Sequence, residues 1–68
     1  MKKHIQKHLK NAEDSIYDLF GEKRDNLVYA KEELQAVLDD PEADEEAKSK
    51  AKEMMHQVID ELAEIDYC

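Results

Sequence analysis

His4 and His8 are the residues whose type and spacing first point to chemistry. Four residues apart on a helix, both imidazoles would face one side and could bind the same metal ion. Two histidines leave the coordination shell incomplete, and three lysines among the first seven residues would repel a cation. We therefore expect both histidines, like His56, to be solvated on polar helix faces and to hold no metal.

A second pattern, of acids at alternate positions from Asp40 to Glu46, is similar to the opening ligands of a calcium loop. The sixth position of such a loop requires a glycine for its turn, and here it is Glu45. The twelfth requires a bidentate acid, and here it is Ala51. The sequence therefore does not predict a dedicated calcium site.

No other set of residues indicates catalysis. The chain contains no phosphate-binding glycine loop and no convincing acid–base pair or nucleophile with its base. Cys68 is the last residue, where a thiol is usually exposed and able to form an intermolecular disulfide in an oxidising compartment. We expect a protein that is not an enzyme and that uses no cofactor.

The composition is that of a small, acidic, helix-forming chain. Its 68 residues include 18 Asp and Glu against 10 Lys and Arg, which gives a formal net charge of −8. One glycine and one proline are too few for strands joined by tight turns, and frequent Ala, Glu, Lys and Leu favour helix. No apolar run is long enough to cross a bilayer or to follow the basic N-terminus as in a secretory signal. These features predict a cytoplasmic protein.

Three segments have the apolar spacing of amphipathic helices, at about residues 3–20, 26–38 and 41–65. The second is short enough to be marginal alone, so it must be held by packing on the others. The predicted fold is an all-α, antiparallel three-helix bundle that forms a single domain over residues 1–68.

The expected boundaries rest on a few residues with special backbone preferences. Gly21 follows the first apolar stripe directly and is expected to end that helix in the left-handed conformation. Asp25 or Asn26 is the expected N-cap of the second helix. Asp40 is the expected N-cap of the third, with Pro41 in its first turn.

A long helical hairpin is the alternative fold. Phe20, Leu27 and Leu34 are seven residues apart, which would let residues 3–38 form one helix through Gly21 at a cost of about 1 kcal/mol. Such a helix would extend beyond its shorter partner, so the hairpin would need a second chain to cover it.

The core of so short a chain is small, and a single core of this size gives about 3–5 kcal/mol of stability. Its expected large apolar residues are Ile5, Leu9, Ile16, Leu19, Phe20, Leu27, Val28, Leu34, Val37, Leu38, Met54, Met55, Val58, Ile59, Leu62 and Ile65. A homodimer would add to this stability, with Met55, Ile59 and Leu62 near its interface. The alternative is that Met55 and Ile59 pack on the second helix of the same chain.

Charge placement supports the up-down-up order of the helices. Residues 1–10 hold four lysines and no acid, whereas residues 39–46 hold six acids. In an antiparallel bundle these two segments lie at the same end, so their opposite charges would be neighbours.

The third helix is expected to carry a row of carboxylates. Its acids Glu42, Glu46, Glu53, Asp60 and Glu64 would lie within about 40° of one line along the helix. From residue 53 onward the chain has five acids and neither Lys nor Arg. Tyr29 would lie about 130° from the centre of its own helix's apolar stripe, where an exposed tyrosine can anchor a partner.

This row favours a binding function. A rigid helix lined with carboxylates can occupy a protein groove built for phosphates. In size and charge the chain is similar to the small DNA-mimic proteins with which phages inhibit host proteins. We expect a basic, nucleic-acid-binding protein as partner and no direct contact with nucleic acid or membrane.

One alternative is a structural or regulatory helical module that acts by homo-oligomerisation or by apolar packing on a partner helix. Another is that the acids only keep the protein soluble.

Overall fold

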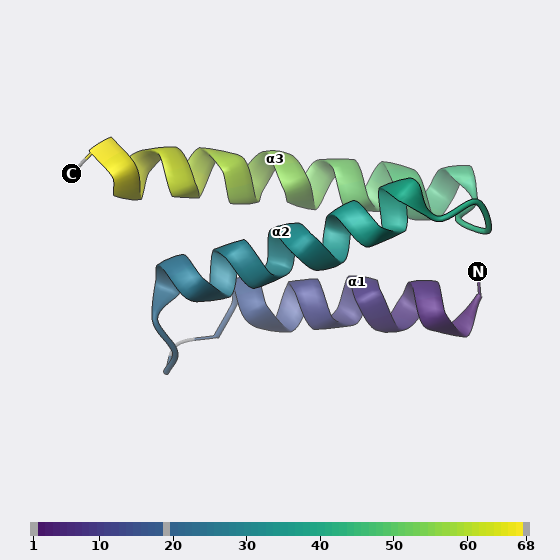
Figure 1. Ribbon diagram of the computed structural model, residues 1–68, viewed down its shortest axis with the longest axis horizontal. Coiled ribbons are helices and arrows are strands. Elements are labelled where there is room, and N and C mark those ends of the chain that lie inside the picture. Colours follow the sequence, from purple (N-terminus) through teal and green to yellow (C-terminus); the bar gives the residue numbers. More distant parts are fainter. Residues whose placement is uncertain (1, 19, 68) are drawn as a thin grey trace.

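The computed structural model describes residues 2–18 and 20–67, the last two of these by their backbone alone. Within these ranges the chain forms helices α1 (Lys3–Ile16), α2 (Lys23–Asp39) and α3 (Glu45–Tyr67) and no strand. The helices run up, down and up, and α2 packs against both α1 and α3 (Figure 1). The predicted all-α three-helix bundle is confirmed.

The break between α1 and α2 excludes the long hairpin. Helix α1 ends at Ile16, four residues before the expected end. Asp18 Oδ1 then accepts the backbone N–H of Phe20 at 2.9 Å. In a continuing helix this N–H would donate to the backbone carbonyl four residues earlier, so the side-chain bond favours the break. The expectation for Gly21 was wrong, because its φ is not positive and it does not adjoin the end of α1.

Helix α2 begins earlier than the apolar pattern indicated. Its N-cap is Glu22 rather than Asp25 or Asn26, and the N–H of Asn26 already donates to the Glu22 carbonyl at 3.0 Å. The first turn therefore contains Lys23 and Arg24, which are good helix formers and need no apolar neighbour. Apolar spacing could not reveal a turn that faces solvent.

The second break lies where the sequence placed it, but a different residue caps the helix that follows. Asp40 is the C-cap of α2, and its Oδ1 accepts the N–H of Glu42 at 2.8 Å in a turn that includes Pro41. Asp44 Oδ1 instead accepts the N–H of Ala47 at 2.8 Å, which is the side-chain bond of an N-cap. Asp40 and Asp44 have the same side chain and could each cap α3. Asp40 forms the turn before the helix, so Asp44 is the residue that caps it.

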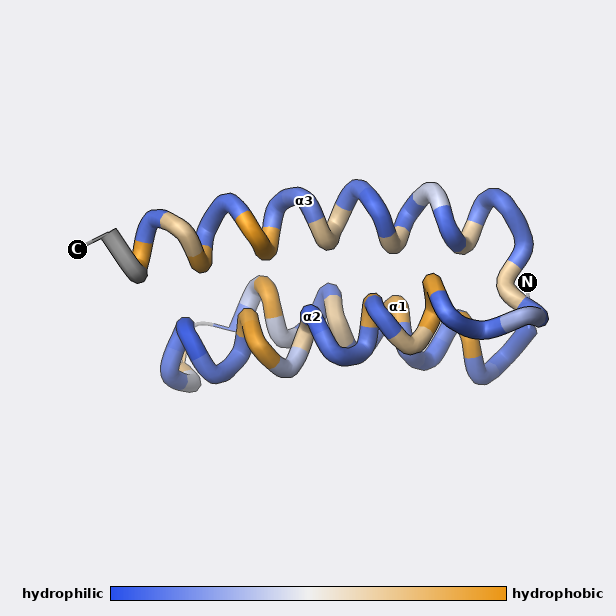
Figure 2. The backbone as a smooth tube through the Cα atoms, turned by 45° about the horizontal axis from the view of Figure 1, so that its top comes forward, coloured by the Kyte–Doolittle hydropathy of each residue, from blue (hydrophilic) through white to orange (hydrophobic). Residues whose placement is uncertain are grey.

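The core runs along the inner sides of all three helices, where the apolar residues lie (Figure 2). Its buried members are Ile5, Leu9, Ala12, Leu27, Ala30, Leu34, Val37, Ala43, Ala47, Ala51, Met55 and Val58. Several are alanines of α3 and its approach, which let that helix come close to its neighbours. Ile16, Leu38, Met54, Leu62 and Ile65 pack around this centre and are partly buried.

Three residues expected in the core lie outside it. Phe20 is 99% exposed, because α1 ends before reaching it and the chain turns away. Val28 and Ile59 are 41% and 49% exposed at the edges of the apolar faces of α2 and α3. Leu19 lies outside the described residues. The core is therefore smaller than the apolar composition suggested.

Candidate functional site

Four exposed acids form a line along α3, and we call Glu46, Glu53, Asp60 and Glu64 the α3 acidic row. Their spacings of seven, seven and four residues place them on one side of the helix, about 10.5 or 6 Å apart. His4, His8 and Lys23 each pair with an acid outside the row, and no ion pair between described residues includes a member of the row. These carboxylates therefore face water without a basic partner in the described structure.

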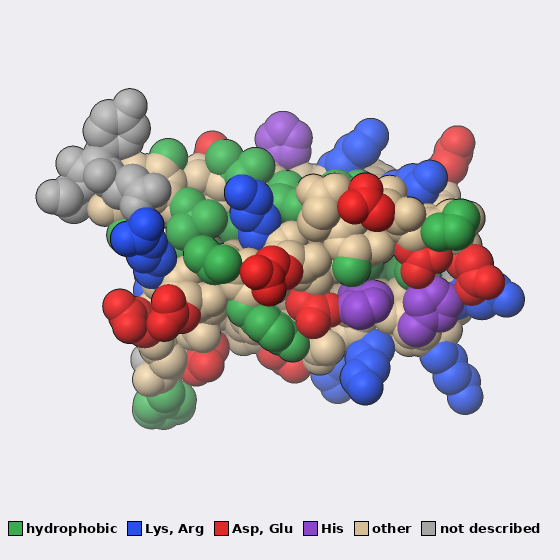
Figure 3. Space-filling view, in the orientation of Figure 1, with side chains coloured by type: hydrophobic (Ala, Val, Ile, Leu, Met, Phe, Trp, Pro, Cys, Tyr) green, Lys and Arg blue, Asp and Glu red, His purple; other side chains and the backbone are tan. Residues whose placement is uncertain are grey.

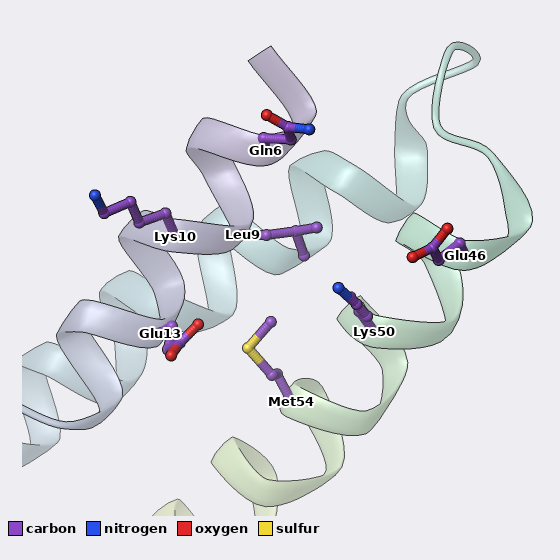
Figure 4. Close-up of a pocket in the computed structure, with 7 residues that line it drawn as sticks. All are labelled: Gln6, Leu9, Lys10, Glu13, Glu46, Lys50 and Met54. Atoms are coloured by element: carbon purple, nitrogen blue, oxygen red, sulfur yellow. The ribbon is translucent and has the colours of Figure 1, made fainter. Parts of the chain in front are cut away.

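The side chains that neighbour the row differ in charge along its length. Lys50 lies one turn after Glu46, and both line a shallow hollow between α1 and α3 (Figure 4). The hollow has Leu9 and Met54 among its lining residues, with a mixture of positive and negative side chains. Beyond Lys52, α3 carries no Lys or Arg of its own, and Lys23 of α2 reaches this stretch at Glu61, 3.5 Å away. Glu53, Asp60 and Glu64 therefore form the part of the row that has no basic residue on its own helix.

Glu42 and Tyr29 do not join this row. Because α3 begins only at Glu45, Glu42 lies in the preceding turn, and its Oε2 is 3.6 Å from His4 Nε2. Tyr29 is 45% exposed on α2, where a hydrogen bond with the Glu33 carboxylate, then its charge, raise the pKa of the tyrosine. The sequence placed Glu42 in the row, and this was wrong, because Glu42 precedes α3 and lies beside His4 of α1. Tyr29 is exposed on α2, as the sequence predicted, and contacts Glu33 of the same helix.

The three residues expected at a dimer interface are differently placed. Met55 is buried within the chain, Leu62 is partly buried, and Ile59 is half exposed. Hydrophobic side chains do gather over α2 and α3 on the face seen in Figure 3. Of the three, Ile59 offers the most surface to a second molecule.

A second polar cluster joins α1 to the end of α2. The ring of His4 donates through Nε2 to Asp40 Oδ2 at 3.0 Å, and Glu42 completes a group of three potential metal ligands. One donor atom from each residue lies within 4.8 Å of the others. On the face in Figure 3, histidine side chains lie among acidic ones towards the end where α2 leads into α3.

The Asp40 carboxylate accepts a hydrogen bond from the backbone as well as from His4. The Glu42 N–H bond lowers the pKa of the Asp40 carboxyl, partial burial opposes this, and the hydrogen bond and charge of His4 lower it further. The same carboxylate thus accepts the Glu42 N–H with Oδ1 and faces His4 with Oδ2. This arrangement orients Asp40 towards α1.

His8 lies one turn further along α1 and makes a parallel contact. Its Nδ1 hydrogen-bonds Glu33 Oε2 on α2, and the same Glu33 is the group that perturbs Tyr29. Both histidines keep contact with solvent, as expected, but each also faces a carboxylate distant in sequence, which the sequence did not predict. His56 on α3 is exposed, as expected.

One signal in the sequence did anticipate this cluster. The basic start of the chain was expected beside the acidic residues 39–46, and the His4 contacts with Asp40 and Glu42 place them together. Which side chains meet could not be predicted, because the contacts cross between α1 and residues that follow α2.

Comparisons with known proteins assign no family or function to the chain. No family model, no curated protein and no solved structure matches the chain. Among the described helices, none has an apolar stretch long enough to cross a bilayer. Cys68 lies outside the described residues.

Proposed function

We propose that the protein is a non-enzymatic binding protein that presents the α3 acidic row to a basic, nucleic-acid-binding protein and blocks it. The observation that carries this proposal is the exposure of Glu53, Asp60 and Glu64 with no ion-pair partner among the described residues. Carboxylates that serve folding are normally paired or hydrogen-bonded, whereas these three keep their charge available to a partner.

The helix makes the row a fixed array. Helix α3 has 23 residues and is anchored by fully buried Ala47, Ala51 and Val58. The carboxylates therefore project from a helix that is held against the bundle by these contacts. DNA carries one negative charge per about 1.7 Å of helix axis, so the row is sparser than a duplex. It would replace only a few phosphates in a basic groove.

The net charge of −8 adds a long-range component to this recognition. An acidic surface attracts a basic groove and raises the association rate, and salt screens the attraction with a Debye length of about 10 Å at 0.1 M. Binding through the row should therefore weaken steeply as salt increases.

The test begins with an affinity pull-down from cell lysate at low salt, with salt-gradient elution and mass spectrometry. The partner is then purified, and its binding is compared between the wild type and the triple variant Glu53→Lys, Asp60→Lys and Glu64→Lys. Lysine is a good helix former, and positive charge near the end of α3 suits the helix dipole, so the variant should fold. Each lost contact should cost on the order of 1 kcal/mol, more if it is desolvated.

A matched control separates the row from overall charge. Asp14→Lys, Glu22→Lys and Glu32→Lys change three exposed acids outside the row and shift the net charge by the same amount. The proposal predicts that the row variant loses binding and competition with DNA, while the control retains most of both. Equal binding by the folded row variant and the wild type would show that the acids only provide solubility.

A second candidate function rests on the exposed apolar residues. Val28 on α2 and Ile59 on α3 are each about half exposed, and Phe20 is almost fully exposed. They suit a structural or regulatory module that packs on a partner helix or on a second copy of the chain. This alternative predicts binding that persists in high salt, or a homodimer of the 8.0 kDa chain by sedimentation equilibrium.

A further inference from the structure

We infer that His4, Asp40 and Glu42 form a binding site for a divalent transition-metal ion, with zinc the best match. The inference is independent of the proposed partner binding, which uses α3. It starts from one donor atom on each of the three residues, all within 4.8 Å of one another, with His4 Nε2 beside both Asp40 Oδ2 and Glu42 Oε2.

The distances suit a tetrahedral ion. Donor atoms bound to one zinc ion at about 2.0–2.2 Å are separated by about 3.3–3.6 Å. His4 Nε2 is 3.0 Å from Asp40 Oδ2, slightly below that range, and 3.6 Å from Glu42 Oε2, at its upper end. The side chain of Glu42 is 55% exposed and can rotate, so an ion can be admitted without moving a helix.

The ligand types select among metals. One imidazole nitrogen and two carboxylate oxygens match zinc and related ions, and a water molecule would complete four-coordination. Calcium requires six to eight oxygen ligands, which three side chains including a histidine do not supply. On binding, the ion replaces the Nε2 proton that His4 shares with Asp40: a neutral imidazole moves this proton to Nδ1, whereas an imidazolium, which already carries both protons, releases it to solvent.

Two features outside the donor set favour a cation here. Asp40 Oδ1 accepts the Glu42 N–H at 2.8 Å, which fixes the carboxylate with its other oxygen facing His4, as outer hydrogen bonds do in metal sites. The site also adjoins the carboxyl end of α2, whose last turn has no basic residue of its own. The negative end of the α2 dipole therefore lies beside the ion.

The positive charges nearby limit the affinity without excluding the ion. Lys3 and Lys7 are exposed on α1 and the amino end of that helix is positive, so both disfavour a cation. Asp39, Asp44 and Glu45 are close to Asp40 and Glu42 in the sequence and add negative charge. A moderate, reversible affinity follows, with solvent access through the half-exposed imidazole.

The test is a zinc titration of the full chain near neutral pH by isothermal calorimetry, with thermal unfolding followed by circular dichroism. All proteins carry Cys68→Ser, because a thiol would bind zinc on its own. We expect one ion per chain, a higher melting temperature with zinc, and a loss of affinity of about tenfold or more in His4→Ala, Asp40→Asn and Glu42→Gln. His4 and Glu42 are exposed, and Asp40→Asn keeps an oxygen that can accept the Glu42 N–H, so each variant should retain its helical spectrum.

His8→Ala is the matched control, because His8 is on the same helix one turn away and its Nδ1 is engaged by Glu33. It should bind zinc as the wild type does, and in the wild type the ring ¹⁵N shifts of His4 should move while those of His8 and His56 stay in place. The inference is overturned if zinc does not saturate the wild type by about 1 mM. It is equally overturned if His4→Ala binds unchanged, or if His8→Ala loses as much affinity as His4→Ala.

Discussion

Truncation of two large apolar side chains should separate the true core from the core that composition suggests. Phe20 and Leu34 both fit the same seven-residue spacing in the sequence, yet Phe20 is 99% exposed and Leu34 is fully buried. We predict that Phe20→Ala leaves the free energy of unfolding almost unchanged, whereas Leu34→Ala removes most of it.

The magnitude for Leu34 follows from what the substitution deletes. Three buried carbon groups at about 0.8 kcal/mol each account for about 2.4 kcal/mol of transfer free energy. The cavity adds to this, so about 3 kcal/mol is expected, within the range of Leu→Ala changes in cores. Alanine and leucine are both good helix formers, so propensity offsets little of the loss. A bundle with about 3–5 kcal/mol of stability would then be close to its unfolding threshold.

The assay is urea unfolding followed by circular dichroism, with free energies from linear extrapolation at a shared slope. The wild type and Phe20→Ala should have the same midpoint, and Leu34→Ala a much lower one. A loss above about 1 kcal/mol in Phe20→Ala would refute the reasoning, since a side chain that stays in water has no burial to lose. It would mean that Phe20 packs on the bundle or on a second chain.

Two further outcomes concern a helix cap and a tyrosine. Asp44→Ala should cost about 1 kcal/mol in urea unfolding, because it removes the bond to the Ala47 N–H, whereas Glu45→Ala should cost much less; equal losses would show that Asp44 is not the cap. Tyr29 should ionise above the ordinary tyrosine value of 10.0, because Glu33 raises its pKa. The folded-state pKa exceeds the unfolded one, so this contribution to stability is present below about pH 10 and is lost as pH rises through the folded-state pKa. Absorbance titration of tyrosinate should show the pKa of Tyr29 falling towards 10.0 in Glu33→Gln, and superimposable curves for the two proteins would contradict the Glu33 contact.

The sequence by itself determined the fold class and most of the core. Helical spacing of Ile5, Leu9, Leu27, Leu34 and Val58 is a local property, and all five are buried. The break at residues 39–41 was also predictable, because proline restricts its neighbours whatever the rest of the chain does. The approximate meeting of the basic start with the acidic turn followed from helix order and charge alone.

Tertiary structure decided what those local rules leave open. Asp40 and Asp44 have the same capping chemistry, and only the path of the turn assigns Asp44 to α3 and Asp40 to His4. Phe20 continues the apolar spacing, but the early end of α1 leaves it in solvent. His4 and Asp40 are 36 residues apart, so no periodicity could have paired them. Contacts between elements depend on how helices pack, and that packing is set by the whole core rather than by any one segment.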